Sequence, residues 1–241
     1  MPNEVVIITQ ARMTSTRLPG KILMRAGERT LLETHLDRLA DVGVPVIVAT
    51  TTNLSDTPVV ELCAALDVPV FRGSENDVLE RYRGAAWAHE ARHVIRVTSD
   101  CPLICPDVIR AGLDIYSGLK SESIYLSNGE KRTYPRGMDF EIFSRRSLDF
   151  AAENAKLPSE REHVTGYIRT SIPDIRHEYC ADEEDLSDWR ITVDTDDDFK
   201  LAKLLIEDHH AAEMDYPGLK ALLKAYPELM RINSHIQQKP I

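Results

Sequence analysis

Residues 5–21 of this 241-residue chain read VVIITQARMTSTRLPGK. The β-branched run at their start is typical of a buried strand in a parallel sheet. The loop that follows contains Arg12, Arg17 and Lys21, small hydroxyl residues and a Pro-Gly turn. An open α/β sheet binds polyphosphates in such loops, at the carboxyl ends of its strands. Three cations this close repel one another unless an anion lies among them. The stretch therefore predicts an anion site; a solvated basic loop is the alternative.

Strand and helix patterns alternate through the first half of the chain. Apolar runs predict strands at residues 4–9, 45–50, 69–71 and 93–98. Amphipathic patterns predict helices at residues 31–40, 57–67, 75–91 and 106–118. Such alternation indicates βαβ units with right-handed crossovers. We therefore expect an α/β fold with a doubly wound, mostly parallel sheet.

The pattern changes after about residue 119. Strands are predicted at 123–127, 138–143, 175–180 and 189–194, with turn-rich segments among them and a final helix from Thr195 to about residue 209. We interpret residues 120–182 as an inserted α+β excursion from the sheet. Residues 1–241 are expected to form a single domain, with residues 210–241 as a C-terminal helical appendage.

Composition excludes several classes of protein. The net charge of −10 argues against a general nucleic-acid binder, which would carry a basic surface. No apolar stretch approaches the roughly 18–20 residues of a membrane span, and the N-terminus has no signal-peptide pattern. We therefore expect a cytoplasmic protein without membrane insertion. The four cysteines lack zinc-site spacing and are predicted to be free thiols.

Five segments, in order, resemble conserved blocks of the sugar cytidylyltransferases. Residues 11–21 match the pattern Ala-Arg-x-x-Ser-x-Arg-Leu-Pro-Gly-Lys throughout. The other blocks are FRGSENDVLERY at 71–82, RVTSDCPLI at 96–104 (with Ser99 where glycine is usual), SEREHVT at 159–165 and VDT at 193–195. The chain is most similar to the spore-coat-polysaccharide-type family, which is related to the 3-deoxy-manno-octulosonate and acylneuraminate cytidylyltransferases. The resemblance spans roughly residues 4–206 and implies a nucleotide-diphospho-sugar transferase-like fold.

The resemblance implies transfer of a nucleotidyl group from CTP, a reaction that depends on positioning and on cationic stabilisation of phosphate oxygens. Lys21 is the predicted partner of the leaving phosphates, and Arg12 and Arg17 are suited to the β- and γ-phosphates. Gly20 lets the backbone approach the ligand. The expected nucleotide-binding residues are Ala11, Arg12, Arg17, Gly20, Lys21, Arg72, Ser74 and Thr98, of which Arg72 and Ser74 follow from the second block. The expected catalytic residues are Lys21, Arg12 and Asp100.

Two aspartates are candidate metal ligands. Asp100 lies just past the predicted strand at 93–98, and Asp194 ends the apolar run at 191–193. Neighbouring strands could bring the two together, and the resemblance places magnesium on these same positions. Magnesium takes carboxylate, phosphate and water oxygens. A helix cap or turn is the alternative for each residue, although Pro102 follows too soon for Asp100 to cap a regular helix.

The candidate acceptor-binding residues are Arg136, Asp139, Glu141, Arg161 and His163. Asp139 and Glu141 alternate along a predicted strand and so share a face. Arg161 and His163 could face an acidic acceptor or could form a solvated helix surface. The segment at 137–141 departs from the usual pattern of the ketosugar-acid enzymes, which argues against a sialate-like acceptor. The resemblance also implies that residues 120–182 form the acceptor site and a homodimer surface.

These patterns favour a CTP-dependent cytidylyltransferase that transfers CMP to an acidic sugar or a related small acceptor in surface-glycan or related biosynthesis, releasing pyrophosphate. The alternative is a metal-dependent nucleotide-sugar glycosyltransferase, whose usual Asp-x-Asp motif is found here only in the aspartate run that begins at Asp194. A non-catalytic binding module is a third possibility, and the presence of Lys21 and both aspartates argues against it. The sequence does not name the acceptor.

Overall fold

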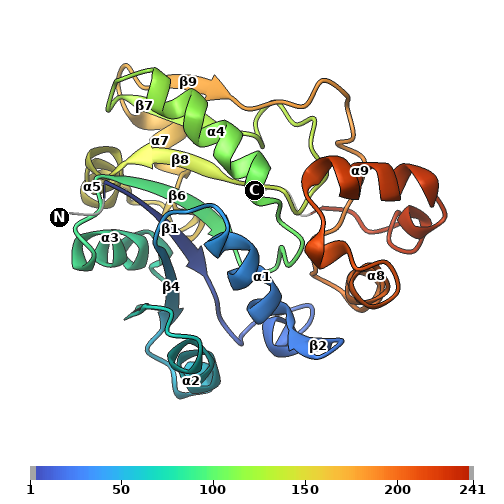
Figure 1. Ribbon diagram of the computed structural model, residues 1–241. Helices are drawn as coiled ribbons and strands as arrows, with labels where there is room; N and C mark the ends of the chain where they lie inside the picture. The colour runs from blue at the N-terminus through green and yellow to red at the C-terminus, as the bar shows by residue number, and fades with distance from the viewer. Residues whose placement is uncertain (1–3, 239–241) are drawn as a thin grey trace.

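The structure, a computed structural model, describes residues 4–238. Its centre is a seven-stranded sheet with the order β5-β4-β1-β6-β8-β7-β9 (Figure 1). The strands are β1 (Val5–Gln10), β4 (Val46–Thr51), β5 (Val70–Gly73), β6 (His93–Thr98), β7 (Ile124–Ser127), β8 (Glu141–Ser144) and β9 (Arg176–Tyr179). Only β8 runs against its neighbours β6 and β7. A separate two-stranded hairpin joins β2 (Arg25–Ala26) and β3 (Arg29–Thr30). The mostly parallel sheet predicted from the sequence is confirmed.

Helices cover both faces of this sheet. They are α1 (Leu31–Ala40), α2 (Thr57–Ala65), α3 (Val78–Ala88), α4 (Pro106–Gly118), α5 (Arg145–Asn154), α6 (Pro158–His163), α7 (Gly166–Ser171), α8 (Asp196–Glu207) and α9 (Tyr216–Ala225). Helix α1 begins at a capping box formed by Thr30 and Glu33. The helices expected at 31–40 and 106–118 have the predicted bounds.

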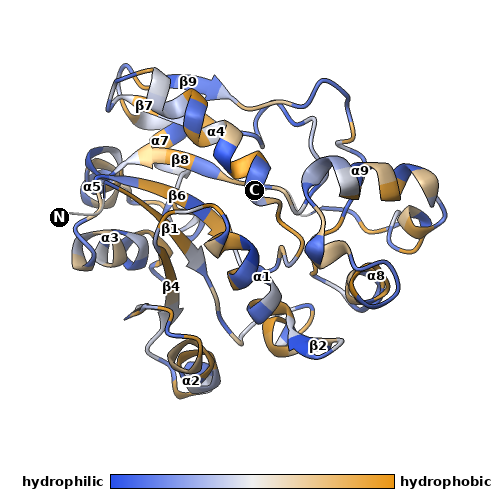
Figure 2. Ribbon diagram, viewed as in Figure 1, coloured by the Kyte–Doolittle hydropathy of each residue, from blue (hydrophilic) through white to orange (hydrophobic). Residues whose placement is uncertain are grey.

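Alternation along the strands divides the core into two layers. Ile7 and Ile95 pack on one face of the sheet with residues of α1 and α4. Val6, Ile8 and Val94 pack on the other face with residues of α3, α5 and α7. The central strands are accordingly rich in hydrophobic residues (Figure 2). Because successive side chains of a strand point to opposite faces, each central strand contributes to both layers.

Residues 120–182 contribute three strands to the main sheet instead of forming a region outside it, in contrast to the expected excursion. Strands β7, β8 and β9 extend the sheet beyond β6. The strand predicted at 138–143 begins only at Glu141, because the Asn128 side chain bonds the preceding backbone. Its amide donates to the Met138 carbonyl (2.6 Å) and accepts from the Phe140 N–H (2.9 Å). A side chain thus satisfies backbone groups that a neighbouring strand would otherwise pair with.

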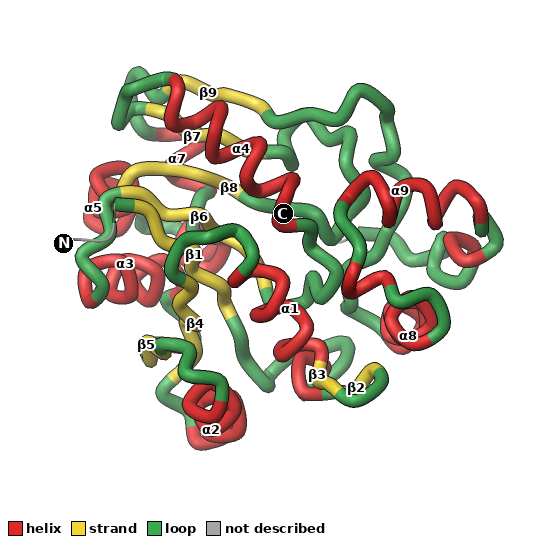
Figure 3. The backbone as a smooth tube through the Cα atoms, viewed as in Figure 1, coloured by secondary structure: helices red, strands yellow, loops and turns green. Residues whose placement is uncertain are grey.

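The strand predicted at 189–194 is wrong. This segment is drawn as loop before α8 (Figure 3) and has one isolated bridge, between Arg136 and Arg190. Its backbone bonds two other loops: the Ile191 N–H donates to the Arg136 carbonyl (2.8 Å), and the Val193 N–H donates to the Asp100 carbonyl (2.8 Å). Gly137 permits this crossing, since its φ is +109° and a Cβ there would lie 2.8 Å from the Thr192 nitrogen.

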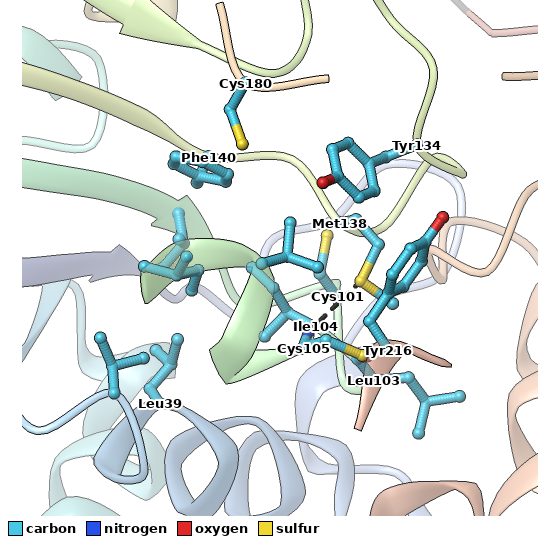
Figure 4. Packing of buried hydrophobic residues seen from close by; sticks show 14 of the residues in the cluster. Leu39, Cys101, Leu103, Ile104, Cys105, Tyr134, Met138, Phe140, Cys180 and Tyr216 are labelled. Atoms are coloured by element: carbon cyan, nitrogen blue, oxygen red, sulfur yellow. Dashed lines mark hydrogen bonds between the residues drawn. The ribbon is translucent and has the colours of Figure 1, made fainter. Parts of the chain in front are cut away.

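The four cysteines are buried free thiols, as expected. Cys101, Cys105 and Cys180 lie among apolar side chains of one core cluster, which includes Phe140 and Met138 (Figure 4). Within residues 4–238, no helix combines the length and apolar character needed to cross a membrane.

Candidate active site

Lys21 and two aspartates form the centre of the candidate site. The Lys21 ammonium donates to Asp100 Oδ2 (3.0 Å), to Asp194 Oδ1 (2.8 Å) and to the Val193 carbonyl (2.6 Å). Lys21 is only 7% exposed. Asp100 follows β6, whereas Asp194 precedes α8, so residues far apart in the sequence meet at one nitrogen atom. The two candidate metal ligands therefore converge, although Asp194 does not lie on a neighbouring strand as the sequence suggested.

The loop that delivers Lys21 is held at several points. Gly20 adopts a left-handed conformation (φ +71°) before a short 3₁₀ turn, and its N–H donates to the Met13 carbonyl (2.9 Å). The Met13 N–H donates to Asp56 Oδ1 (2.7 Å), and the Thr14 hydroxyl donates to Glu75 (2.5 Å). These bonds join the loop to the segments that follow β4 and β5. The cationic loop is thus fixed by polar contacts from neighbouring strand ends.

The charges of this centre stabilise one another. Burial alone would lower the pKa of Lys21, but Asp100 and Asp194 raise it above its usual value. Burial would likewise raise the pKa of Asp100, but Lys21 and a hydrogen bond from Thr98 lower it to about 2. At neutral pH the ammonium and the Asp100 carboxylate are therefore both ionised.

Asp194 has further cationic partners. Arg17 and Arg190 each donate to its second carboxylate oxygen at 2.8 Å. Arg190 is buried and also bonds Asp198 Oδ1 (2.8 Å) and Gln238 (2.6 Å). Thr195 caps α8 in a capping box with Asp198. Asp194 therefore does not cap this helix, which was the alternative role expected for it.

The remaining nucleotide-side residues surround the same strand ends. Ala11 is buried directly after β1, and Arg12 lies within electrostatic range of Glu75. Arg72 donates to the carbonyls of Thr51 and Asn53, both at 2.9 Å. The Ser74 hydroxyl accepts from the Asp77 N–H (3.2 Å) in the turn before α3. Thr98 ends β6 next to Asp100 and Cys101. All the predicted nucleotide-binding residues therefore lie on β1, β5, β6 or the loops at their carboxyl ends.

His35 was not anticipated from the sequence. It is fully buried on α1, and burial lowers its pKa to about 4, so the ring is neutral. Its Nδ1 lies 2.8 Å from the Cys101 carbonyl, which requires Nδ1 to be the donor, and its Nε2 then accepts from the Thr9 hydroxyl (2.9 Å). Thr9 also contacts Ser99 (2.9 Å). This network supports the turn that carries Asp100; its only sequence signal is a polar residue on an apolar helix face.

A cavity of about 230 Å³ opens from the aspartate pair towards β7 and β8. Its lining includes four arginines, Arg96, Arg132, Arg136 and Arg169, and five carboxylates, Asp100, Glu130, Asp139, Glu141 and Asp194. Thr98, Ser127, Asn128, His163, Thr165 and Gln238 contribute further polar groups. The predicted acceptor residues Arg136, Asp139, Glu141 and His163 all line this cavity.

Most of the charged residues in the cavity are paired. Arg96 bonds Glu141, which also accepts from the Tyr125 hydroxyl and from Thr165 (2.7 Å). Burial would raise the pKa of Glu141, but Arg96 and these hydroxyls lower it below its ordinary value. Other pairs are Arg132 with Asp139, and Arg169 with Glu130 (3.8 Å).

Arg136 is the exception among the cavity arginines: within residues 4–238 it forms no ion pair. Burial, together with Arg132 and Arg190 nearby, lowers the pKa of Arg136. Among the described residues, the buried atoms Arg96 Nε, Arg132 Nη1 and Arg169 Nε have no hydrogen-bond partner. The cavity lining therefore includes one arginine without an ion pair and three arginines with one buried, unsatisfied nitrogen each.

Arg161 differs from the expectation, because it is not part of the cavity lining. Its guanidinium donates to Asp77 (Nε, 2.8 Å; Nη2, 2.6 Å) and to the carbonyls of Ala152 (3.0 Å) and Ala155 (3.1 Å). It joins α6 to the start of α3 and the end of α5. Arg161 and His163 are two residues apart on α6, but only His163 lines the cavity.

The aspartate pair fits a divalent cation of the magnesium type. Magnesium is commonly held by one or two carboxylates, with phosphate and water oxygens completing the octahedron. Asp100 and Asp194 supply two converging carboxylates. Over residues 4–238, no group of three or more Cys, His, Asp or Glu side chains is arranged to hold a metal ion. The donor set thus suits a metal shared with a phosphate substrate rather than an all-protein site.

Comparison with known proteins relates this arrangement to one family. The family model described as Cytidylyltransferase matches residues 6–205. A cytidylyltransferase structure from Leptospira borgpetersenii superposes with a TM-score of 0.89 and 33% identity, over 98% of this chain and 99% of that chain. An uncharacterised protein of Methanocaldococcus jannaschii is 35% identical over 98% of this chain and 97% of its own. The spore coat polysaccharide biosynthesis protein SpsF of Bacillus subtilis is 29% identical over 85% of this chain and 87% of its own.

Proposed function

The chain belongs to the cytidylyltransferase family, and from that premise we propose that it transfers CMP from CTP to an acidic sugar or a related small acceptor. The single observation that carries the proposal is the meeting of a cationic loop and an arginine-lined cavity at Lys21, Asp100 and Asp194. A nucleotidyl transfer needs this junction, since the triphosphate and the acceptor must meet at one phosphorus atom.

The reaction forms a bond between an acceptor oxygen and the α-phosphorus and breaks the bond to the β-phosphate, so that pyrophosphate leaves. Negative charge grows on the phosphate oxygens, and preorganised cations stabilise it. Lys21, Arg12 and Arg17 extend from the loop after β1 and supply this charge. The acceptor hydroxyl gives up its proton to solvent water as the new bond forms, and Asp100, ionised at neutral pH, lines the adjacent end of the cavity.

Asp100 and Asp194 would hold a magnesium ion, which supplies Lewis-acid stabilisation of the phosphates when it is bound. The chain's own contribution is to aim both carboxylates at one point and, through Lys21, to keep Asp100 ionised. Arg190 fixes the orientation of Asp194, and the His35 network supports the backbone beside Asp100.

On the acceptor side, the unpaired Arg136 supports an acceptor with one anionic group. The paired carboxylates and the buried hydroxyls of Tyr125 and Thr165 suit a ligand that also carries several hydroxyl groups. Spore coat polysaccharide biosynthesis is the process named for the Bacillus subtilis relative, and we propose a role in surface-glycan or related biosynthesis here. The homodimer and the cytoplasmic location expected from the sequence stay predictions.

A glycosyltransferase is the second candidate, but the contacts of the aspartates give less support to the Asp-x-Asp metal motif that this class uses. In the run of aspartates from 194 to 198, Asp194 contacts Lys21, whereas Asp198 caps α8 and pairs with Arg190. Asp197 lies 3.3 Å from His235. The run therefore divides among several roles instead of presenting two carboxylates to one metal.

Thermal protection tests the nucleotide. A ligand that binds the folded state raises its melting temperature by mass action. With magnesium present, CTP should protect the protein more than ATP, GTP or UTP, and pyrophosphate should then be released when a suitable acidic sugar is added. Equal protection by all four nucleotides would remove the cytidylyl assignment, and better protection by a UDP- or GDP-sugar would favour the glycosyltransferase.

A further inference from the structure

The Lys21 ammonium occupies the point at which the Asp100 and Asp194 carboxylates converge. Its three acceptors, Asp100 Oδ2, Asp194 Oδ1 and the Val193 carbonyl, lie 2.6–3.0 Å from Nζ. An ammonium group has three N–H donors, and each is matched here by one acceptor. Lys21 consequently has no donor left for a phosphate unless it gives up one of these partners.

The same point is where the carboxylate pair would hold a divalent cation. A second cation placed beside a buried ammonium meets strong repulsion, because screening by water is weak there. The ammonium and the metal therefore compete for the two carboxylates. The side chain of lysine is a flexible four-carbon stem that carries a compact charge, so it can redirect its ammonium without a change of fold.

The partners of Asp194 differ in how readily they can leave. Arg190 is anchored, since its side chain is only 5% exposed and it also bonds Asp198. Arg17 is more accessible, with 28% of its side chain exposed, and Asp194 is its only ion-pair partner within residues 4–238. Lys21 and Arg17 both belong to the loop that a triphosphate would approach. The carboxylate thus keeps one permanent cation and has two that an anion can draw away.

We infer that Lys21 acts as a placeholder cation: it fills the Asp100–Asp194 site in the nucleotide-free protein and moves to the triphosphate, so that a divalent cation binds the pair only together with nucleotide. The inference rests on the proposed CTP-dependent function. It makes nucleotide and metal binding cooperative, and it keeps the two carboxylates compensated when neither is present. Such coupling is reciprocal by thermodynamic linkage.

Manganese binding to the nucleotide-free protein tests the inference. Free Mn²⁺ is counted by its electron paramagnetic resonance signal, and it prefers oxygen ligands as magnesium does. Lys21→Met removes the competing ammonium while keeping an unbranched side chain. We expect this variant to bind Mn²⁺ at least about tenfold more tightly than the wild-type protein, within the usual range of coupling between sites.

Two further variants isolate the effect. Lys203→Met removes one positive charge from an exposed pair with Glu207 on α8 and should leave Mn²⁺ affinity unchanged, which controls for net charge. Lys21→Met combined with Asp100→Asn should lose the gain, because it removes one of the two carboxylates. Lys21→Gln, which is neutral but polar, serves as a second variant if the methionine protein is poorly folded.

Equal Mn²⁺ affinity in wild-type and Lys21→Met proteins would overturn the inference, as would a gain that survives Asp100→Asn. Failure of both Lys21 variants to fold would also overturn it, since Lys21 would then be a fixed structural ion pair. The proposed function fails separately: if CTP does not protect the wild-type protein, the nucleotide assignment is lost whatever the Mn²⁺ result. If CTP binds and reacts but Mn²⁺ affinity does not respond to Lys21, only the placeholder role is lost.

Discussion

The two sides of the candidate site handle positive charge differently. Beside β5, β4 and β1, Arg72 donates to two backbone carbonyls. Within residues 4–238, neither Arg72 nor Arg12 forms an ion pair. Beside β8, β7 and β9, Arg96 and Arg132 each bond a carboxylate, and of the four cavity arginines Arg136 alone forms no ion pair within residues 4–238. Arg12 and Arg72, which have no carboxylate partner, favour a polyanion at the strand ends, whereas a cavity whose charges are mostly paired, apart from Arg136, favours a ligand with a single negative group. Lys21 lies where the two sides meet, and in the nucleotide-free protein its charge is balanced by Asp100 and Asp194.

The largest effect should come from the residue shared by both sides. Lys21→Ala should slow turnover by about 100- to 1,000-fold, which is the cost of losing one preorganised contact to transition-state charge. Steady-state kinetics at saturating CTP and acceptor measure this effect, with circular dichroism to verify the fold. Normal turnover by a folded Lys21→Ala protein would show that the site does not centre on Lys21.

The cavity side of the site is tested by removing one member of its partly buried Arg96–Glu141 pair. Glu141→Gln should destabilise the fold by about 2 kcal/mol, since Arg96 would lose a charge-assisted hydrogen bond and its carboxylate partner. The folded-state pKa of Glu141 lies below its ordinary value. Glu141 therefore adds stability above its unfolded pKa of about 4.3, and this contribution is lost as the pH falls through the lower folded pKa.

Chemical denaturation at pH 7 and at decreasing pH measures this prediction. The stability of the wild-type protein should fall more steeply below about pH 4.3 than that of Glu141→Gln. If the free energy of unfolding fell equally with pH in both proteins, the Arg96–Glu141 pair would not be the cause of the loss of stability at low pH.

The unpaired cation of the cavity should affect the acceptor and not the nucleotide. Arg136→Ala should raise the KM for an anionic acceptor by about 10- to 100-fold, because a hydrogen bond to a charged group is worth about 1.5–3 kcal/mol and each 1.4 kcal/mol is a factor of about ten. Thermal protection by CTP should be unchanged. A loss of CTP protection would place Arg136 on the nucleotide side and would contradict the distinction between the two sides of the site.

The smallest effect is expected at Arg161, which the structure places outside the cavity. Arg161→Ala should lower stability by only about 1 kcal/mol, through loss of its partly exposed bonds to Asp77 and to two carbonyls. The KM for acceptor should not change. An acceptor effect as large as that of Arg136→Ala would return Arg161 to the binding site.

Local patterns in the sequence sufficed for the strands and helices of the parallel half. The runs at 93–98 and 106–118 became β6 and α4 with the predicted bounds, because apolar periodicity and cap residues act within a few residues of one another. The segment at 189–194 has the same apolar character but no strand beside it. Its backbone groups bond the loops around Arg136 and Asp100 instead, and no local pattern encodes that outcome.

The sequence by itself determined that a cationic loop follows the first strand, since Arg12, Arg17 and Lys21 lie within ten residues directly after it; their roles in binding nucleotide stay predictions. It could not determine that Lys21 is a buried bridge between Asp100 and Asp194, that His35 lies beneath the Asp100 turn, or that Arg161 is committed to Asp77. Those facts depend on contacts between residues 65 or more positions apart. Only the packing of the whole chain brings such charges within a few ångströms, and at that distance their pairing decides which of them a ligand can still reach.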